Sequence, residues 1–167
     1  MQRLINGIEK ISDWSGKVSA WMIIPMILVI VYTVVMRYFF SRYPSWGFEI
    51  ALFVYGIHFI LGGAYTLKEK AHVNVDILLP LLPKGMRKIL EIAGMIVILF
   101  VCVIIVWLGT KYSWQSTRIL ERSIHQTPFN PQIWWFKWFI PISAALVALQ
   151  TIADILKQII KTKTIGE

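Results

Sequence analysis

Four long stretches of the chain contain no charged residue, and they set its overall pattern. Asp, Glu, Lys and Arg are absent from residues 18–36, 50–67, 92–110 and 140–153. The last of these stretches is short, but an aromatic run interrupted only by Lys137 precedes and extends it. A helix of about 20 apolar residues crosses the hydrocarbon of a membrane. The pattern therefore predicts four transmembrane helices, at about residues 18–36, 47–67, 90–110 and 133–155.

Two other fold classes fit this pattern less well. A soluble protein would have to bury four helices that are apolar on every side, and too little polar sequence remains to cover them. A transmembrane β-barrel would need segments of about ten residues in which apolar and polar positions alternate, and the sequence lacks that alternation. We therefore expect an all-α integral membrane protein, in which residues 1–167 form a single membrane domain.

The composition agrees with a membrane protein. Hydrophobic residues make up 57% of the chain and charged residues only 16%, whereas about a quarter of the residues of soluble proteins are charged. A cleaved signal peptide would have an apolar run of roughly 7–15 residues. The first run here is longer and ends at Arg37, so we interpret it as a retained helix. The single cysteine, Cys102, permits no disulfide framework within one chain.

The segment before the first span has the spacing of an amphipathic helix. Its apolar positions are Leu4, Ile5, Ile8, Ile11 and Trp14. Its polar positions are Arg3, Asn6, Glu9, Lys10, Asp13 and Lys17. This spacing predicts a short N-terminal helix that lies in the membrane interface.

The distribution of Lys and Arg predicts the orientation of the chain. These residues accumulate on the cytoplasmic side of membrane proteins. With the N-terminus inside, the inner segments hold eleven of the 17 Lys and Arg residues and the outer segments hold six. We therefore expect both termini to be cytoplasmic. The net charge of +8 fits this orientation and contact with anionic headgroups, so we expect membrane lipids and not nucleic acid as partners.

Two connections between the spans contain candidate surface residues. The inner connection, 68–91, is too apolar for a free loop, and we expect it to lie against the membrane. Its His72 and Asp76 are four residues apart, which favours a structural polar pair over a metal site. The outer connection, 111–132, is the longest surface that faces outward.

Basic residues outnumber acidic ones on this outer surface. Lys111, Arg118 and Arg122 are accompanied only by Glu121. Such a surface would steer a soluble partner that has an acidic docking face. We therefore name these three cations as docking candidates, with Arg42 in the shorter outer loop as the next one.

Few ionisable groups are predicted to lie within or beside the spans. Arg37 ends the first span and Glu49 opens the second at a similar depth, so we expect them to form an ion pair. His58 lies near the middle of the second span, where we favour a neutral imidazole hydrogen-bonded to a neighbouring helix. Haem ligation would need a second axial ligand such as Met26, because no other histidine lies inside a span.

Small and aromatic residues are predicted to shape the packing surfaces. Gly56 and Gly63 share one helical face and permit close approach of another helix, of this chain or of a second protein. Pro25 and Pro141 are expected to kink the first and fourth spans. An outer aromatic belt anchors the depth of the spans. It comprises Trp46, Trp134, Trp135 and Trp138.

Several motifs resemble the small membrane subunit of tripartite ATP-independent periplasmic (TRAP) transporters. Trp46 and Glu49 open the second span in the family's manner, and the run 62–65, Gly-Gly-Ala-Tyr, is followed by Ala-His-Val-Asn-Val-Asp at 71–76. The second half of the chain resembles the family more loosely. Its matching residues are Glu121, Arg122, Ser123, Pro128, Trp134 and Pro141. One departure is that Gly47 and Phe48 precede a lone Glu49, where members of the family often carry two adjacent acidic residues.

The resemblance implies one part of a three-part importer in a bacterial or archaeal inner membrane. A periplasmic protein would capture an organic acid, and a large multi-spanning subunit would carry it inward with a sodium gradient. The small subunit would scaffold the large one and help to dock the binding protein. It would have no substrate site, no cofactor and no enzymatic activity. Two other classes are also compatible with the residues: a stand-alone proton-coupled exporter, and a haem-bearing anchor subunit of an oxidoreductase.

Overall fold

The computed structural model describes residues 2–69, 84–124 and 128–165, and its regular structure over these ranges is helical. Four candidate spans, Arg3–Phe39, Ser45–Lys68, Ile89–Arg118 and Trp134–Gln158, are long and apolar enough to cross a membrane. The protein is therefore an all-helical membrane protein, as the charge pattern predicts. The helices are α1 (Gln2–Trp21), α2 (Ile23–Phe39), α3 (Ser45–Lys68), α4 (Lys84–Arg118), α5 (Trp134–Lys137) and α6 (Phe139–Ile165).

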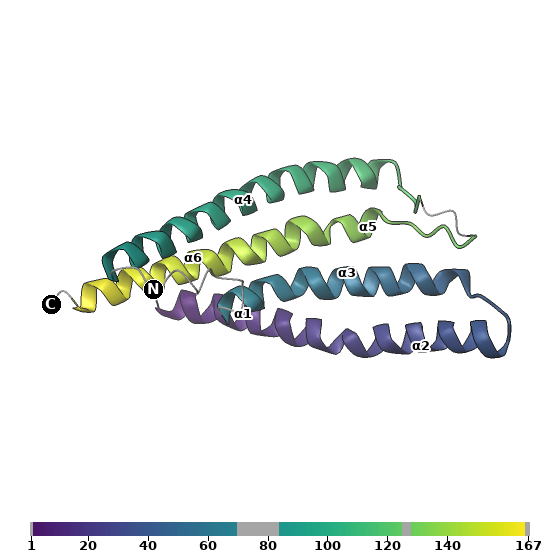
Figure 1. The fold of residues 1–167 in the computed structure, drawn as a ribbon. Helices are drawn as coiled ribbons and strands as arrows, with labels where there is room; N and C mark the ends of the chain where they lie inside the picture. The colour runs from purple at the N-terminus through teal and green to yellow at the C-terminus, as the bar shows by residue number, and fades with distance from the viewer. Residues whose placement is uncertain (1, 70–83, 125–127, 166–167) are drawn as a thin grey trace.

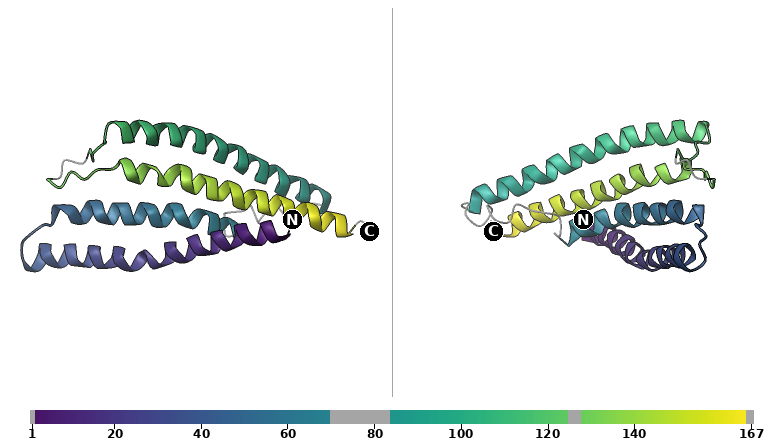
Figure 2. Two further views of the ribbon diagram at one scale, coloured as in Figure 1. Left: turned by 180° about the vertical axis from the view of Figure 1, so that it is seen from behind. Right: turned by 45° about the vertical axis from the view of Figure 1, so that its right-hand side comes forward.

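The long helices lie side by side in a row (Figure 1). Helix α6 packs on α4 and α3, and α3 packs on α2, so that α4 and α2 form the two edges. Helix α1 packs on α3 and α6 at the end of the molecule where both termini lie. Figure 2 shows the same order from two further directions. We call the end with the termini the inner end and the opposite end the outer end.

Little of each span is buried within the chain itself. In the most apolar window of each span, the buried share is 6% in the first three and 28% in the fourth. Soluble monomers rarely expose large apolar surfaces, whereas lipid or another membrane protein can cover such a surface. The side chains that are buried are mostly small, which permits close helix packing in membranes. They include Ala64, Cys102, Ala144, Ala153 and five serines.

Helix α1 differs from the short interfacial helix that the sequence predicts, and that helix is not confirmed. It has 20 residues and is separated from α2 by Met22 alone. Its serine face is buried against the other helices, whereas Leu4, Ile11 and Trp14 are exposed. The buried face consists of Ile5, Ser12, Ser15 and Ser19. The sequence pattern separated apolar from charged positions, but it did not identify the serine face that packs against α3 and α6.

Both prolines follow a break in a helix by one turn. Pro25 has no N–H to donate to the carbonyl of Trp21, and the first span breaks at Met22. Pro141 likewise cannot donate to the carbonyl of Lys137, and the fourth span breaks between α5 and α6. The hydroxyl of Ser113 in α4 donates to that carbonyl at 2.9 Å. The second break is thus held by a hydrogen bond from a neighbouring helix.

The helices also extend further than the predicted spans. Helix α4 has 35 residues and is about 52 Å long at 1.5 Å per residue, well beyond a hydrocarbon thickness of about 30 Å. Lys111 and Arg118 are therefore helical, and the outer connection begins only at residue 119. His72 and Asp76, and the predicted contact of the inner connection with the membrane, lie outside the described residues.

Candidate interaction surfaces

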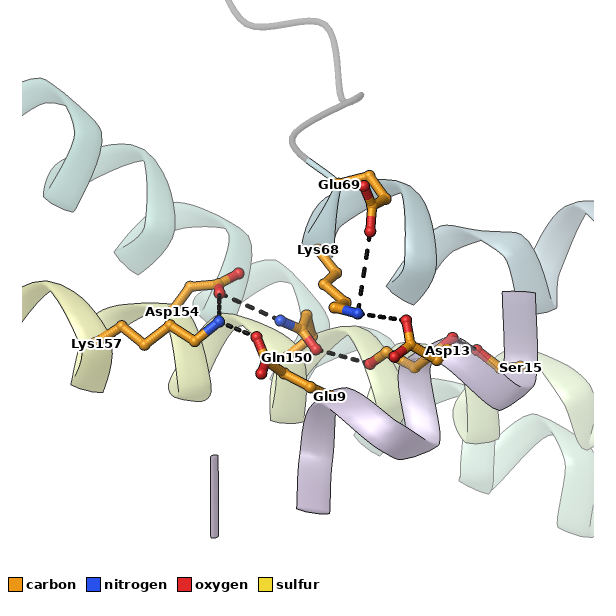
Figure 3. Close-up of polar contacts among 9 residues, drawn as sticks. Glu9, Asp13, Ser15, Lys68, Glu69, Gln150, Asp154 and Lys157 are labelled. Carbon is orange, nitrogen blue, oxygen red and sulfur yellow. Dashed lines mark hydrogen bonds and ion pairs between the residues drawn. The ribbon is translucent and has the colours of Figure 1, made fainter. Parts of the chain in front are cut away.

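Charged residues at the inner end connect α1, α3 and α6, as Figure 3 shows. Lys157 of α6 forms an ion pair with Glu9 of α1 and lies 3.8 Å from Asp154. Lys68 at the end of α3 forms an ion pair with Asp13 of α1. Both acidic residues of α1 are thus directed into the molecule. We call this set the inner polar cluster: Glu9, Ser12, Asp13, Lys68, Gln150, Asp154 and Lys157.

A buried glutamine lies within the inner polar cluster. Gln150 is completely buried, and its Oε1 accepts a hydrogen bond of 2.7 Å from the hydroxyl of Ser12. Its Nε2 donates to Asp154 at 3.2 Å. A buried polar group whose partners are in place fixes the arrangement of its neighbours. This contact could not be predicted from the sequence, because Ser12 and Gln150 are 138 positions apart.

His58 of α3 forms hydrogen bonds with Ser19 near the junction between α1 and α2. Its Nδ1 lies 2.7 Å from the carbonyl oxygen of Ser19 and 3.1 Å from the Ser19 hydroxyl. That hydroxyl donates in turn to the carbonyl of His58 at 2.7 Å. These contacts match the interpretation of His58 as an imidazole hydrogen-bonded to a neighbouring helix.

The hairpin of α2 and α3 packs closely near its turn. The ring of Trp46 stacks on Tyr32 with centroids 5.5 Å apart. A Cβ on Gly47 would come within 2.3 Å of the Thr33 hydroxyl, so only glycine fits there.

The two residues expected to form an ion pair lie in different surroundings. Glu49 is almost fully buried. Arg37 is exposed, and its guanidinium carbon lies 5.8 Å from the centre of the Tyr43 ring. The expected pair between Arg37 and Glu49 stays a prediction.

The two candidate glycines of α3 face this chain's own helices. A Cβ on Gly56 would lie 2.5 Å from the ring of Phe136 in α5. A Cβ on Gly63 would lie at an ordinary 3.5 Å from Val147 in α6. Their face therefore packs within the chain, which was one of the two alternatives that the sequence left open.

The outer end of α4 and the connection that follows it carry the predicted cations. Lys111, Arg118 and Arg122 are all exposed, and the Arg118 guanidinium lies 5.8 Å from the centre of the Trp114 ring. Arg42, in the loop between α2 and α3, is exposed at the same end. The structure thus brings the four docking candidates to one end of the molecule.

An ion pair neutralises the one acidic residue of this connection. Lys137 Nζ lies 2.5 Å from Glu121 Oε2. The hydrogen bond from Lys137 lowers the pKa of Glu121 below its usual value. Backbone hydrogen bonds from Ser123 to Pro131 and from Ile133 to Glu121 hold the base of the loop. The exposed charge that remains is positive.

These features define the class of the protein. It is a multi-pass membrane subunit whose polar contacts join its own helices, and whose apolar helix faces and basic outer end are exposed. Within the part of the chain that the structure describes, no three His, Cys, Asp or Glu side chains gather in a way that could hold a metal ion.

Comparison with known proteins identifies the family. The profile of the tripartite ATP-independent periplasmic transporters, DctQ component, matches residues 26–161. The chain belongs to this family, and it is a small permease subunit of a TRAP transporter. The family is a transporter component and not an enzyme class.

Two relatives carry corresponding descriptions. A protein of Haemophilus influenzae described as a TRAP transporter small permease is 37% identical over 84 residues, which are 49% of this chain and 50% of that protein. The C4-dicarboxylate TRAP transporter small permease protein DctQ of Vibrio cholerae is 26% identical over 106 residues, which are 64% of this chain and 45% of that protein. The chain spans about half the length of the curated relatives it matches.

Proposed function

We propose that this subunit scaffolds a large multi-spanning transport subunit and helps to dock a periplasmic binding protein. The observation that carries the proposal is the open row of helices, in which only 6% of the most apolar window is buried in three of the four spans. Such a layer has two broad apolar faces that a second membrane protein can cover. Its polar contacts join the helices to one another, as in the hydrogen bond between Ser12 and Gln150.

The proposed docking surface is the basic outer end. Lys111, Arg118 and Arg122 are exposed there, while Glu121 is paired with Lys137. A binding protein with an acidic face would be attracted to this surface, and such charges act mainly on the association rate and its salt dependence. In this proposal the binding protein docks outside an inner membrane, and both termini lie in the cytoplasm.

The transported substrate is proposed to be an organic acid, carried with a sodium gradient by the large subunit. The family match supports this proposal, since the Vibrio cholerae relative is described as a C4-dicarboxylate transporter component. On this reading the binding protein and the large subunit select the acid. The small subunit has few charged groups within its spans with which to coordinate an anion.

Reconstitution tests the scaffold role. Liposomes that contain the large subunit, the binding protein and this chain should take up the organic acid under a sodium gradient, and liposomes that lack this chain should not. The chain alone should move no acid, and it should co-purify with the large subunit. Robust transport by the chain alone would contradict the proposal and favour a proton-coupled exporter. A Soret band on the purified chain would favour the haem-bearing class.

Charge reversal tests the docking surface. Arg118→Glu with Arg122→Glu should lower uptake at low salt, while co-purification with the large subunit and substrate capture by the binding protein stay intact. Arg3→Glu with Lys10→Glu, a reversal of two exposed cations at the inner end, is the matched control and should leave the salt dependence of uptake unchanged. Unchanged uptake by the double reversal would exclude this connection and leave Arg42 as the next candidate.

A further inference from the structure

A groove lies on the exposed face of α1 where this helix meets α2. It has a volume of about 470 Å³. The two tryptophans that border it, Trp14 and Trp21, are 68% and 71% exposed. All of its lining residues precede residue 26, where the family match begins. They are Trp14, Lys17, Val18, Trp21, Met22 and Pro25.

The groove is apolar except for a cation. Lys17 immediately precedes the first predicted span, so it lies at the expected boundary between headgroups and hydrocarbon. Val18, Met22 and Pro25 continue from it toward the membrane interior. Tryptophan rings also favour this boundary. The order of polar and apolar groups along the groove matches that of a phospholipid.

The exposed face of α1 around the groove is positively charged. Arg3, Lys10 and Lys17 are exposed and follow one another at intervals of seven residues, about 10.5 Å along the helix. The acids of the helix do not offset them, because Glu9 is paired with Lys157 and Asp13 with Lys68. The ion pairs of the inner polar cluster thus neutralise the acidic residues of α1, and the exposed charge of this helix is positive. A phosphate group complements the charge that remains.

We propose that this groove binds one anionic phospholipid. Its phosphodiester contacts Lys17, and an acyl chain lies along Val18, Met22 and Pro25 between the two tryptophans. Lipid is favoured over an acidic protein segment because the apolar part of the groove opens at the depth where the bilayer is the solvent. Bound lipid would hold the junction of α1 and α2 at a fixed depth in the membrane.

Binding of phosphatidylglycerol to the purified full chain tests the proposal. In a neutral detergent, phosphatidylglycerol should form a one-to-one adduct in native mass spectrometry and raise Tm, and phosphatidylcholine should do so more weakly. Lys17→Gln should weaken the affinity for phosphatidylglycerol about five-fold, the effect expected for one cation near an anionic membrane surface. Lys111→Gln, which changes an exposed lysine at the outer end, should leave this affinity unchanged. Equal binding of both lipids, or an unchanged affinity in Lys17→Gln, would overturn the proposal.

Cross-linking in membranes tests whether lipid or protein fills the groove. Photoactivatable phosphatidylglycerol should label the peptide containing residues 14–25, both in the chain alone and after co-expression with the large subunit and the binding protein. Loss of labelling on co-expression would mean that protein covers the groove in the assembly, and the proposal would fail. Because the first test uses the chain alone, its result does not depend on the proposed scaffold role.

Discussion

Lys137 makes two contacts at the outer end that serve different purposes. Its side chain pairs with Glu121 of the outer connection. Its backbone carbonyl accepts a hydrogen bond from the hydroxyl of Ser113 in α4. Pro141 has no N–H to donate to this carbonyl. One residue therefore ties both the loop and the neighbouring helix to the start of the fourth span. From the sequence alone, Lys137 is a cation of the outer segments that interrupts an aromatic run, and neither contact can be predicted.

The pair of Glu121 and Lys137 predicts a dependence of stability on pH. The folded-state pKa of Glu121 is lowered, chiefly by the hydrogen bond from Lys137. Its contribution is thus complete above the usual value of 4.5, and it is lost as the pH falls through the lower folded-state pKa. The Tm of the purified chain should fall over this range, and the loss should be smaller in Glu121→Gln. Partly exposed pairs contribute about 0–1 kcal/mol, so the difference should be small. Identical pH profiles for the two proteins would contradict the prediction.

At the scale of the elements, α3 is packed between three other long helices. It packs on α1, α2 and α6, and its small residues permit that packing. Gly56 lies against the ring of Phe136, which is surrounded by other aromatic rings. Those rings belong to Phe53, Trp135 and Phe139. Because these rings limit its movement, Phe136 cannot easily yield space to a larger residue at position 56.

Two glycine-to-alanine substitutions on the same face of α3 should therefore change the free energy of unfolding in different directions. Gly56→Ala puts a methyl group within 2.5 Å of Phe136. Such overpacking costs about 1–3 kcal/mol, against a gain of about 0.5–1 kcal/mol for replacing glycine in a helix. Gly63→Ala places its methyl group at an ordinary distance from Val147 and should keep the gain. The free energy of unfolding in mixed micelles should fall for the first variant and stay equal or rise for the second. Equal effects would mean that the aromatic cluster adjusts freely.

At the scale of the whole molecule, the row of helices separates two polar ends. The inner end holds both termini and the inner polar cluster, and the outer end holds the two loops with their exposed cations (Figure 1). The distribution of Lys and Arg predicts which end faces the cytoplasm. The structure shows that the two termini share an end, and a labelling experiment decides the side of the membrane.

Two single-cysteine variants test this orientation in intact cells. Both require replacement of Cys102 by Ala, which removes the chain's only cysteine. Ile124→Cys lies in the outer connection, where the native side chain is 86% exposed. Gly7→Cys lies near the N-terminus, where a Cβ meets no atom within 4 Å. A membrane-impermeant maleimide should label the first from outside, and the second only after the cells are opened. The reverse pattern would invert the predicted topology.

The sequence by itself determined the fold class, an all-helical protein with four long apolar helices. Water is absent from the hydrocarbon of a membrane, so a long apolar segment must satisfy its backbone N–H and C=O groups internally. A helix does this within the segment itself. The sequence also predicted kinks at Pro25 and Pro141, and each proline lies one turn beyond a helix break. These features depend on residues that are close in sequence, so the sequence alone was sufficient to predict them.

Only the tertiary structure decided which faces pack and which polar groups meet. The spacing in α1 showed two faces, but the serines are buried and Trp14 is exposed because α3 and α6 offer polar partners such as Gln150. The contact between Ser12 and Gln150 and the ion pair between Glu9 and Lys157 each join residues more than 130 positions apart. From the sequence alone, many pairs of residues with complementary polar groups are predicted to lie at a similar depth in the membrane, so many such contacts were possible. The packing of the helices selected among them, since a side chain reaches only the neighbours that its own helix contacts.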